Sequence, residues 1–103
     1  MTAKREAAPG AALSTRVVVV ANRRGLHARA AARFVKLAGE FDAAVEVAKD
    51  DMCVSGLSIM GLMMLSAGPG TEIELRARGD NAAAALDALA TLVARNFDED
   101  QGG

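Results

Sequence analysis

The sequence of 103 residues contains no tryptophan and no tyrosine, and it has only one cysteine and one histidine. The expected strands also carry no phenylalanine, so they lack the aromatic platforms on which single-stranded nucleic acids stack their bases. The lone thiol of Cys53 forms no disulfide within the chain, and one thiol with one imidazole cannot supply the usual zinc ligand sets. We therefore expect no metal, no cofactor and a reducing compartment.

Long apolar runs and an excess of charge of either sign are also missing. The 12 basic and 13 acidic residues give a formal net charge of −1, which creates no general attraction for nucleic acid or an anionic membrane. No segment approaches the roughly eighteen apolar residues of a membrane span, and the N-terminus lacks the apolar core of a signal peptide. These absences predict a cytoplasmic protein that binds neither membrane nor nucleic acid.

The hydrophobic patterns predict one small α/β domain at residues 14–97, between a flexible N-terminal tail at 1–13 and a flexible acidic C-terminal tail at 98–103. Strands are expected at 14–21, 43–49, 52–55 and 72–78, with helices at 27–38, at 57–65 and from 82 to about 96. This β-α-β-β-α-β-α order favours a two-layer open-faced α+β sandwich, in which three helices cover one side of a four-stranded antiparallel sheet. The valine run of the first strand predicts that this strand is buried.

The histidine stands in the segment NRRGLHARAAARF, residues 22–34, at the expected start of a helix. At that position the amides of Ala28, Arg29 and Ala30 would point toward a group on the imidazole of His27, and the guanidinium of Arg29 suits phosphate oxygens. This pattern indicates a phosphoryl-transfer site with an exposed histidine. A histidine that merely begins a helix beside surface arginines would give the same pattern, so a second feature is needed.

The second feature is the segment GLSIMGLMML, residues 56–65, which has more apolar residues than a helix of two turns can bury. Ser58 is placed to cap that helix. The side chains of Ile59, Met60 and Met63 are candidates for an exposed, deformable docking surface. The alternative is that most of these residues are core and only one or two are exposed.

Together the two segments resemble the active-site signature and the regulatory-serine segment of the HPr phosphocarriers, a family of the phosphoenolpyruvate-dependent phosphotransferase system. The resemblance spans residues 15–97. It implies that His27 accepts a phosphoryl group on Nδ1 from enzyme I and passes it to an enzyme IIA protein, with Arg29 holding the phosphate. It further implies phosphorylation of Ser58 by HPr kinase/phosphorylase in some bacteria, and docking through Arg24, Ile59, Met60 and Met63.

Two residues of the first segment depart from the pattern of the family. Ala30 replaces a proline that most members have, and Ala28 replaces a threonine found in many. Alanine is compatible with the first turn of a helix and adds a backbone donor at position 30, so we expect altered rigidity rather than loss of the reactive group.

Several functional alternatives remain open on the sequence. The amino-acid sequences of both segments resemble those of the nitrogen-related branch and of alphaproteobacterial HPr proteins, but a sugar-uptake carrier would share the motifs. A binding-only regulator could act through the Ser58 segment without transferring phosphate. A nucleic-acid module would use arginines as a basic patch, namely Arg16, Arg23, Arg24, Arg29 and Arg33. We favour a monomeric carrier, because one face must serve several partners in turn.

Overall fold

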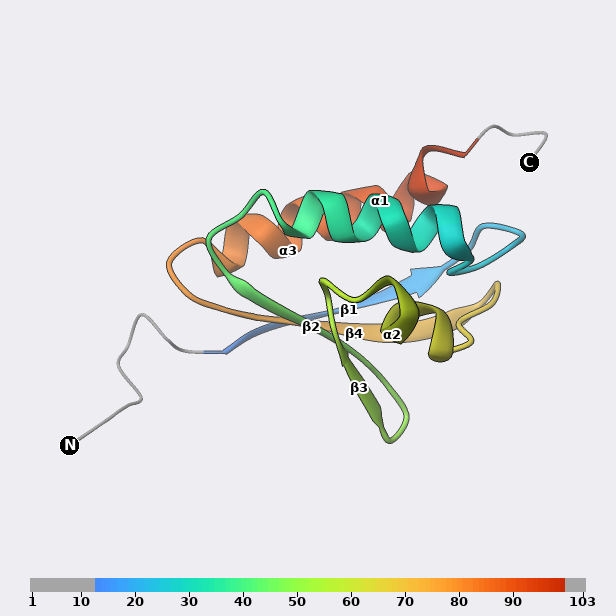
Figure 1. The fold of residues 1–103 in the computed structure, drawn as a ribbon, viewed down its shortest axis with the longest axis horizontal. Helices are drawn as coiled ribbons and strands as arrows, with labels where there is room; N and C mark the ends of the chain where they lie inside the picture. Colours follow the sequence, from blue (N-terminus) through green and yellow to red (C-terminus); the bar gives the residue numbers. More distant parts are fainter. Residues whose placement is uncertain (1–12, 100–103) are drawn as a thin grey trace.

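The computed structural model describes residues 13–99, which form a sheet and a layer of helices (Figure 1). Most of the two predicted flexible tails, residues 1–12 and 100–103, lies outside this range. The elements follow the predicted order: β1 (Ser14–Val20), α1 (Ala28–Ala38), β2 (Ala44–Lys49), β3 (Met52–Ser55), α2 (Ile59–Met64), β4 (Thr71–Arg78), α3 (Ala82–Ala94) and the 3-10 turn η2 (Asn96–Asp98).

The four strands form one antiparallel sheet in the order β1-β4-β2-β3. Strand β4 lies at the centre, with Val18 of β1 opposite Ile73 and Val47 of β2 opposite Leu75. Hairpin β2–β3 turns at Asp50, whose φ of 54° lies in the left-handed region that aspartate tolerates. The predicted antiparallel α+β sandwich is therefore confirmed.

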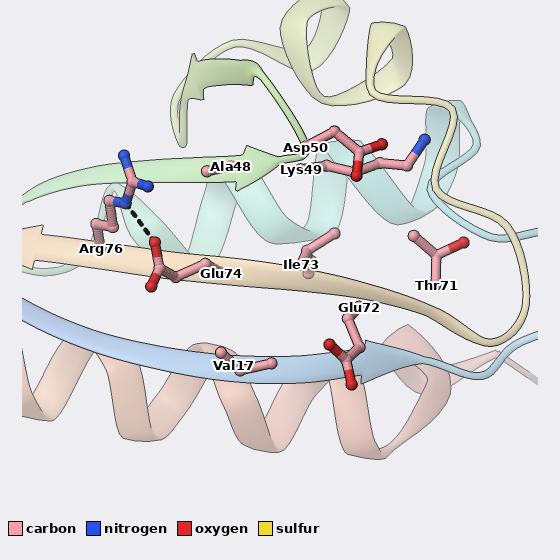
Figure 2. A pocket seen from close by; sticks show the side chains of 9 residues that line it. All are labelled: Val17, Ala48, Lys49, Asp50, Thr71, Glu72, Ile73, Glu74 and Arg76. Atoms are coloured by element: carbon pink, nitrogen blue, oxygen red, sulfur yellow. Dashed lines mark hydrogen bonds and ion pairs between the residues drawn. The ribbon is translucent and has the colours of Figure 1, made fainter.

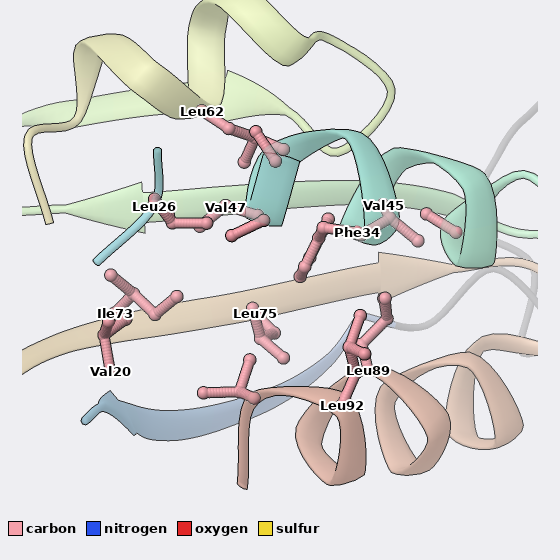
Figure 3. Packing of buried hydrophobic residues seen from close by; sticks show 14 of the residues in the cluster. Val20, Leu26, Phe34, Val45, Val47, Leu62, Ile73, Leu75, Leu89 and Leu92 are labelled. Carbon is pink, nitrogen blue, oxygen red and sulfur yellow. The ribbon is translucent and has the colours of Figure 1, made fainter. Parts of the chain in front are cut away.

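The helices cover a single face of the sheet, and the core lies between the two layers (Figure 1). Phe34 of α1, Leu75 of β4 and Leu89 of α3 belong to one core cluster (Figure 3), and all three side chains are fully buried. Leu62 is the buried residue of α2 and joins the same cluster. This packing holds the start of α1 and the whole of α2 at one end of the helical layer.

The prediction that β1 is a buried strand is wrong. Val17 and Val19 are 58% and 48% exposed, whereas Val20 is fully buried. Strand β1 is an edge strand of a sheet with one open face, so alternate side chains point away from the helices. Figure 2 shows this open face, with the helices behind the sheet and the ion pair of Arg76 with Glu74 in front of it.

The last helix also ends earlier than predicted, at Ala94 rather than near Asn96. Residues 96, 97 and 98 all have left-handed backbones, with φ values of 56°, 57° and 61°. Asparagine and aspartate adopt this conformation at modest cost, but Phe97 is an unusual residue there. Its side chain is fully buried in the core, and this burial offsets the backbone cost.

Candidate functional site

A tight turn places His27 at the start of α1. The amide of Gly25 donates to the Asn22 carbonyl at 3.1 Å, and the φ of Gly25 is 63°, a value that favours glycine. The next amide, that of Leu26, donates to the Ala67 carbonyl at 3.0 Å and ties the turn to the loop after α2. His27 is therefore the N-cap residue, with extended backbone angles and no capping bond from its side chain.

The first turn of α1 presents backbone donors beside His27. The amide of Ala31 donates to the His27 carbonyl at 2.9 Å, which closes the first helical turn. Within residues 13–99, no hydrogen bond uses the amides of Ala28, Arg29 or Ala30. Ala30 is buried, whereas Ala28 and Arg29 are exposed. These amides and the Arg29 guanidinium can receive an anion, as their place at the start of the helix predicts.

The imidazole of His27 is not the exposed group that the sequence predicts, because its side chain is only 14% exposed. The carboxylate of Glu99 covers it, and His27 Nε2 is hydrogen-bonded to Glu99 Oε2. The predicted flexible tail begins at residue 98, but the structure places Asp98 in η2 and Glu99 against His27. A folded contact therefore extends at least two residues beyond the expected domain boundary.

A buried asparagine holds the other oxygen of this carboxylate. Asn22 is 4% exposed, and its Nδ2 donates both to Glu99 Oε1 at 3.0 Å and to the Gly25 carbonyl at 2.9 Å. Burial by itself raises the pKa of Glu99, but the hydrogen bonds from His27 and Asn22, with the nearby charges of His27 and Arg24, more than offset it. The net result is a pKa of Glu99 below its ordinary value, so this carboxylate is ionised at neutral pH.

The second predicted feature, the cap of α2, has the expected local geometry. Ser58 has an extended backbone, and its Oγ accepts a hydrogen bond from the Gly61 amide at 2.9 Å. The side chain is partly exposed. The hydroxyl oxygen of Ser58 therefore stabilises the start of the helix and is also accessible at the surface.

Replacing Ser58 with alanine is expected to lower the free energy of unfolding by about 1 kcal/mol, because the Gly61 amide loses its acceptor. Urea denaturation of the wild type and the variant measures this difference. Ser66→Ala is a matched control, because Ser66 is exposed and its hydroxyl caps no helix. Equal stability of S58A and the wild type would show that the cap bond contributes nothing in solution.

The apolar side chains of α2 divide between core and surface. Leu62 and Leu65 are buried, whereas Ile59, Met60 and Met63 are 40%, 70% and 39% exposed, as predicted for a docking surface. Exposure extends beyond these three residues to Leu57 and Met64. We call these five residues the apolar surface: Leu57, Ile59, Met60, Met63 and Met64.

The apolar surface and the histidine meet in one shallow hollow of about 280 Å³. His27, Arg24 and Met63 all line it, together with residues 66–68 of the loop after α2. Sequence-distant residues that the patterns singled out separately are thus neighbours on one face. Any partner that reaches His27 also meets exposed methionine and arginine.

Two of the five arginines considered as a nucleic-acid patch are held in contacts within the fold. Arg16 on β1 forms an ion pair with Asp87 of α3 at 2.5 Å. Arg33 donates to the Phe97 carbonyl, also at 2.5 Å.

The described residues include no group of three histidine, cysteine or acidic side chains placed to hold a metal ion. No helix between residues 13 and 99 has the length and apolar character needed to cross a bilayer.

Comparison with known proteins agrees with this fold along most of the chain. The family described as "PTS HPr component phosphorylation site" matches residues 14–95. Phosphocarrier protein HPr of Pseudomonas aeruginosa is 46% identical over 83 residues, covering 80% of this chain and 92% of the relative. Phosphocarrier protein NPr of Shewanella violacea is 45% identical over 84 residues, covering 82% and 92%. The crystal structure of HPr-C-His from Thermoanaerobacter tengcongensis gives a TM-score of 0.80 at 38% identity, covering 84% of this chain and 98% of that one.

These matches and the fold define a class, the small proteins that carry a phosphoryl group within a phosphotransferase system and are not themselves enzymes. The chain belongs to the HPr family of phosphocarrier proteins.

Two residues at the site have no signal in the sequence patterns. Asn22 looks like a residue that merely ends a strand, and Glu99 looks like part of a charged end. Their part in the site can be recognised only in the folded structure, where the core brings the turn before α1 close to the turn after α3. A left-handed Phe97 has no local sequence signature that would predict this return of the chain.

Proposed function

We propose that the chain relays a phosphoryl group through His27, from enzyme I to an enzyme IIA protein. The observation that carries this proposal is the position of His27 at the N-cap of α1, beside backbone amides with no partner in residues 13–99. Those donors can hold a phosphate without the entropy cost of ordering long side chains.

Each residue of the site has a proposed part in the relay. The Nδ1 atom of His27 accepts the phosphoryl group, and the amides of Ala28, Arg29 and Ala30 bind its oxygens. The exposed guanidinium of Arg29 can add a charge-assisted contact. Arg24, Ile59, Met60 and Met63 form the docking surface for both partners, since Arg24 and Met63 line the hollow that contains His27.

Ser58 is proposed as a regulatory phosphorylation site for an HPr kinase/phosphorylase. A phosphate there adds about −1.5 to −2 charges beside exposed Ile59 and Met60. Such a charge disfavours docking of an apolar or acidic partner surface, even though it is compatible with the start of the helix. Phosphorylation of Ser58 would therefore reduce transfer through His27.

We place the protein in the nitrogen-related or regulatory branch, and we propose that it acts as a monomer. The support for the branch is the amino-acid sequence of the two motifs. The overall identities of 46% to an HPr and 45% to an NPr do not separate the branches. A sugar-uptake carrier is the second candidate, favoured by the relatives named HPr. The support for a monomer is that the apolar surface has to be open to each partner in turn.

The test is intact-mass spectrometry at neutral to alkaline pH, after incubation with phosphoenolpyruvate and catalytic enzyme I of either the nitrogen-related or the sugar type. We expect a gain of one acid-labile phosphate, mapped to His27 by fragmentation, and formed faster with the nitrogen-related enzyme. Faster reaction with the sugar-type enzyme would favour the sugar-uptake branch. No gain with either enzyme would overturn the relay and leave a binding-only regulator.

A further inference from the structure

The end of the described chain returns to the candidate phosphorylation site and is held there by contacts of Phe97 and Glu99. Arg33 of α1 donates to the Phe97 carbonyl at 2.5 Å, and the Phe97 ring is fully buried. Two residues later, Glu99 accepts hydrogen bonds from Asn22 and His27. The Glu99 side chain is only 11% exposed, so it is part of the folded domain.

The backbone before Glu99 is shaped for this contact. Three successive left-handed residues reverse the chain after α3, and one of them is a phenylalanine. A non-glycine residue in this region costs about 1–2 kcal/mol, so such a turn persists only where other contacts over-determine it. The buried Phe97 ring and its carbonyl bond to Arg33 supply those contacts.

The orientation of Asn22 makes Glu99 a directed acceptor. The Nδ2 group of Asn22 faces two acceptors, the Gly25 carbonyl and Glu99 Oε1, so its amide cannot be turned over without losing both bonds. With one oxygen held by Asn22, the carboxylate presents its other oxygen to His27 Nε2. A carboxylate only accepts hydrogen bonds, so Nε2 must carry the proton.

We propose that Glu99 is a positioning residue for phosphoryl transfer, which holds the proton of His27 on Nε2 and leaves the lone pair on Nδ1. The proposal rests on the proposed function and adds to it a residue at the far end of the chain. In general, a carboxylate hydrogen-bonded to one nitrogen of an imidazole fixes its tautomer and orientation, and so determines which ring nitrogen reacts.

The phosphoryl group passes directly from the phosphorylated donor to His27. The Nδ1 lone pair forms the bond to phosphorus, and the bond between phosphorus and the donor breaks, with its electron pair leaving on the donor. The proton stays on Nε2, so the ring gains positive charge as Nδ1 becomes substituted. Glu99 lies against that charge and stabilises it without entering the covalent step.

The experiment compares Glu99→Ala with Asp98→Asn. Asp98 is the neighbouring carboxylate, but it pairs with Arg95 at 2.8 Å rather than with His27, and asparagine tolerates its left-handed backbone. The change at either position removes one negative charge near the site. The ¹⁵N chemical shifts of the His27 ring report the tautomer, and intact mass after rapid mixing with phosphorylated enzyme I reports the transfer rate.

We expect E99A to lower the ratio of the Nε2-protonated to the Nδ1-protonated tautomer by about three- to tenfold, the equivalent of one hydrogen bond. Its transfer rate should fall by about tenfold. D98N should change neither quantity by more than about twofold. Glu99→Gln keeps only one acceptor oxygen, which cannot serve both Asn22 Nδ2 and His27 Nε2, so it should restore the tautomer ratio and the rate only in part.

The outcomes separate this proposal from the proposed function. If the wild type gains no phosphate on His27, the relay fails, and the tautomer shift still tests the contact with Glu99. If the wild type is phosphorylated but E99A keeps the wild-type tautomer ratio and rate, the positioning role is overturned. A rate loss without a tautomer change, or an equal loss in D98N, would also overturn it, because either result indicates a general effect of charge or stability.

Discussion

Replacing His27 with alanine is expected to abolish the acid-labile phosphate completely, while leaving the fold intact. Alanine has no nitrogen that could carry a phosphoryl group. The His27 side chain makes no capping bond to α1, so the helix loses no capping contact with the ring. The contact with Glu99 is lost, and we expect a decrease in the free energy of unfolding of about 1 kcal/mol.

The matched control for H27A is S58A, because the two proposed phosphates differ in chemistry. A phosphate on an imidazole nitrogen is lost in acid, whereas a serine ester survives. H27A should therefore still be phosphorylated at Ser58 by an HPr kinase, and S58A should still accept the acid-labile phosphate from enzyme I. An acid-labile phosphate on H27A would place the reactive group elsewhere and contradict the proposed relay.

Replacing Gly25 with alanine is expected to lower the free energy of unfolding by about 3–5 kcal/mol, a loss that comes from two causes. The φ of 63° at this position is unfavourable for alanine. The added Cβ would also overlap the Ala67 carbonyl oxygen and lie 2.9 Å from the Gly68 Cα. Since both are backbone atoms, the turn before α1 and the loop after α2 must move apart.

That movement reaches the site, because the Leu26 amide donates to the same Ala67 carbonyl at 3.0 Å. Loss of this bond would displace His27 from the hollow that it shares with Met63. Urea denaturation measures the stability of G25A, and mass spectrometry measures its phosphorylation at a temperature where it is still folded. We expect that phosphorylation to be at least tenfold slower, since small misplacements of reacting groups are costly.

Gly68→Ala is the control for the crowded position, because a Cβ at residue 68 meets no atom within 4 Å. Both substitutions add one methyl group to the same pair of facing loops. G68A should have a free energy of unfolding within about 0.5 kcal/mol of the wild type. Equal stability of G25A and G68A would show that the turn can relax away from the loop, contrary to the tight approach in the structure.

The sequence by itself determined the order of the elements, the antiparallel sheet and the cap of α2. These features depend on local periodicity and on turn residues, such as the alternation from Glu72 to Arg78 and the serine before Ile59. The exposure of Met60 and Met63 was also predictable, because α2 is too short to bury all of its apolar side chains. Each of these predictions needs only residues that are close together in the sequence.

Only the tertiary structure decided which face of β1 is open and what covers His27. The first answer depends on which face of the sheet the helices cover, because even the central strand β4 has one open face, and the valines of a strand do not encode that face. The second depends on Glu99, 72 residues away from His27 in the chain, and on the turn that returns it. A contact over that distance forms because the core brings α1 and α3 together, and local patterns carry no information about which chain ends then meet.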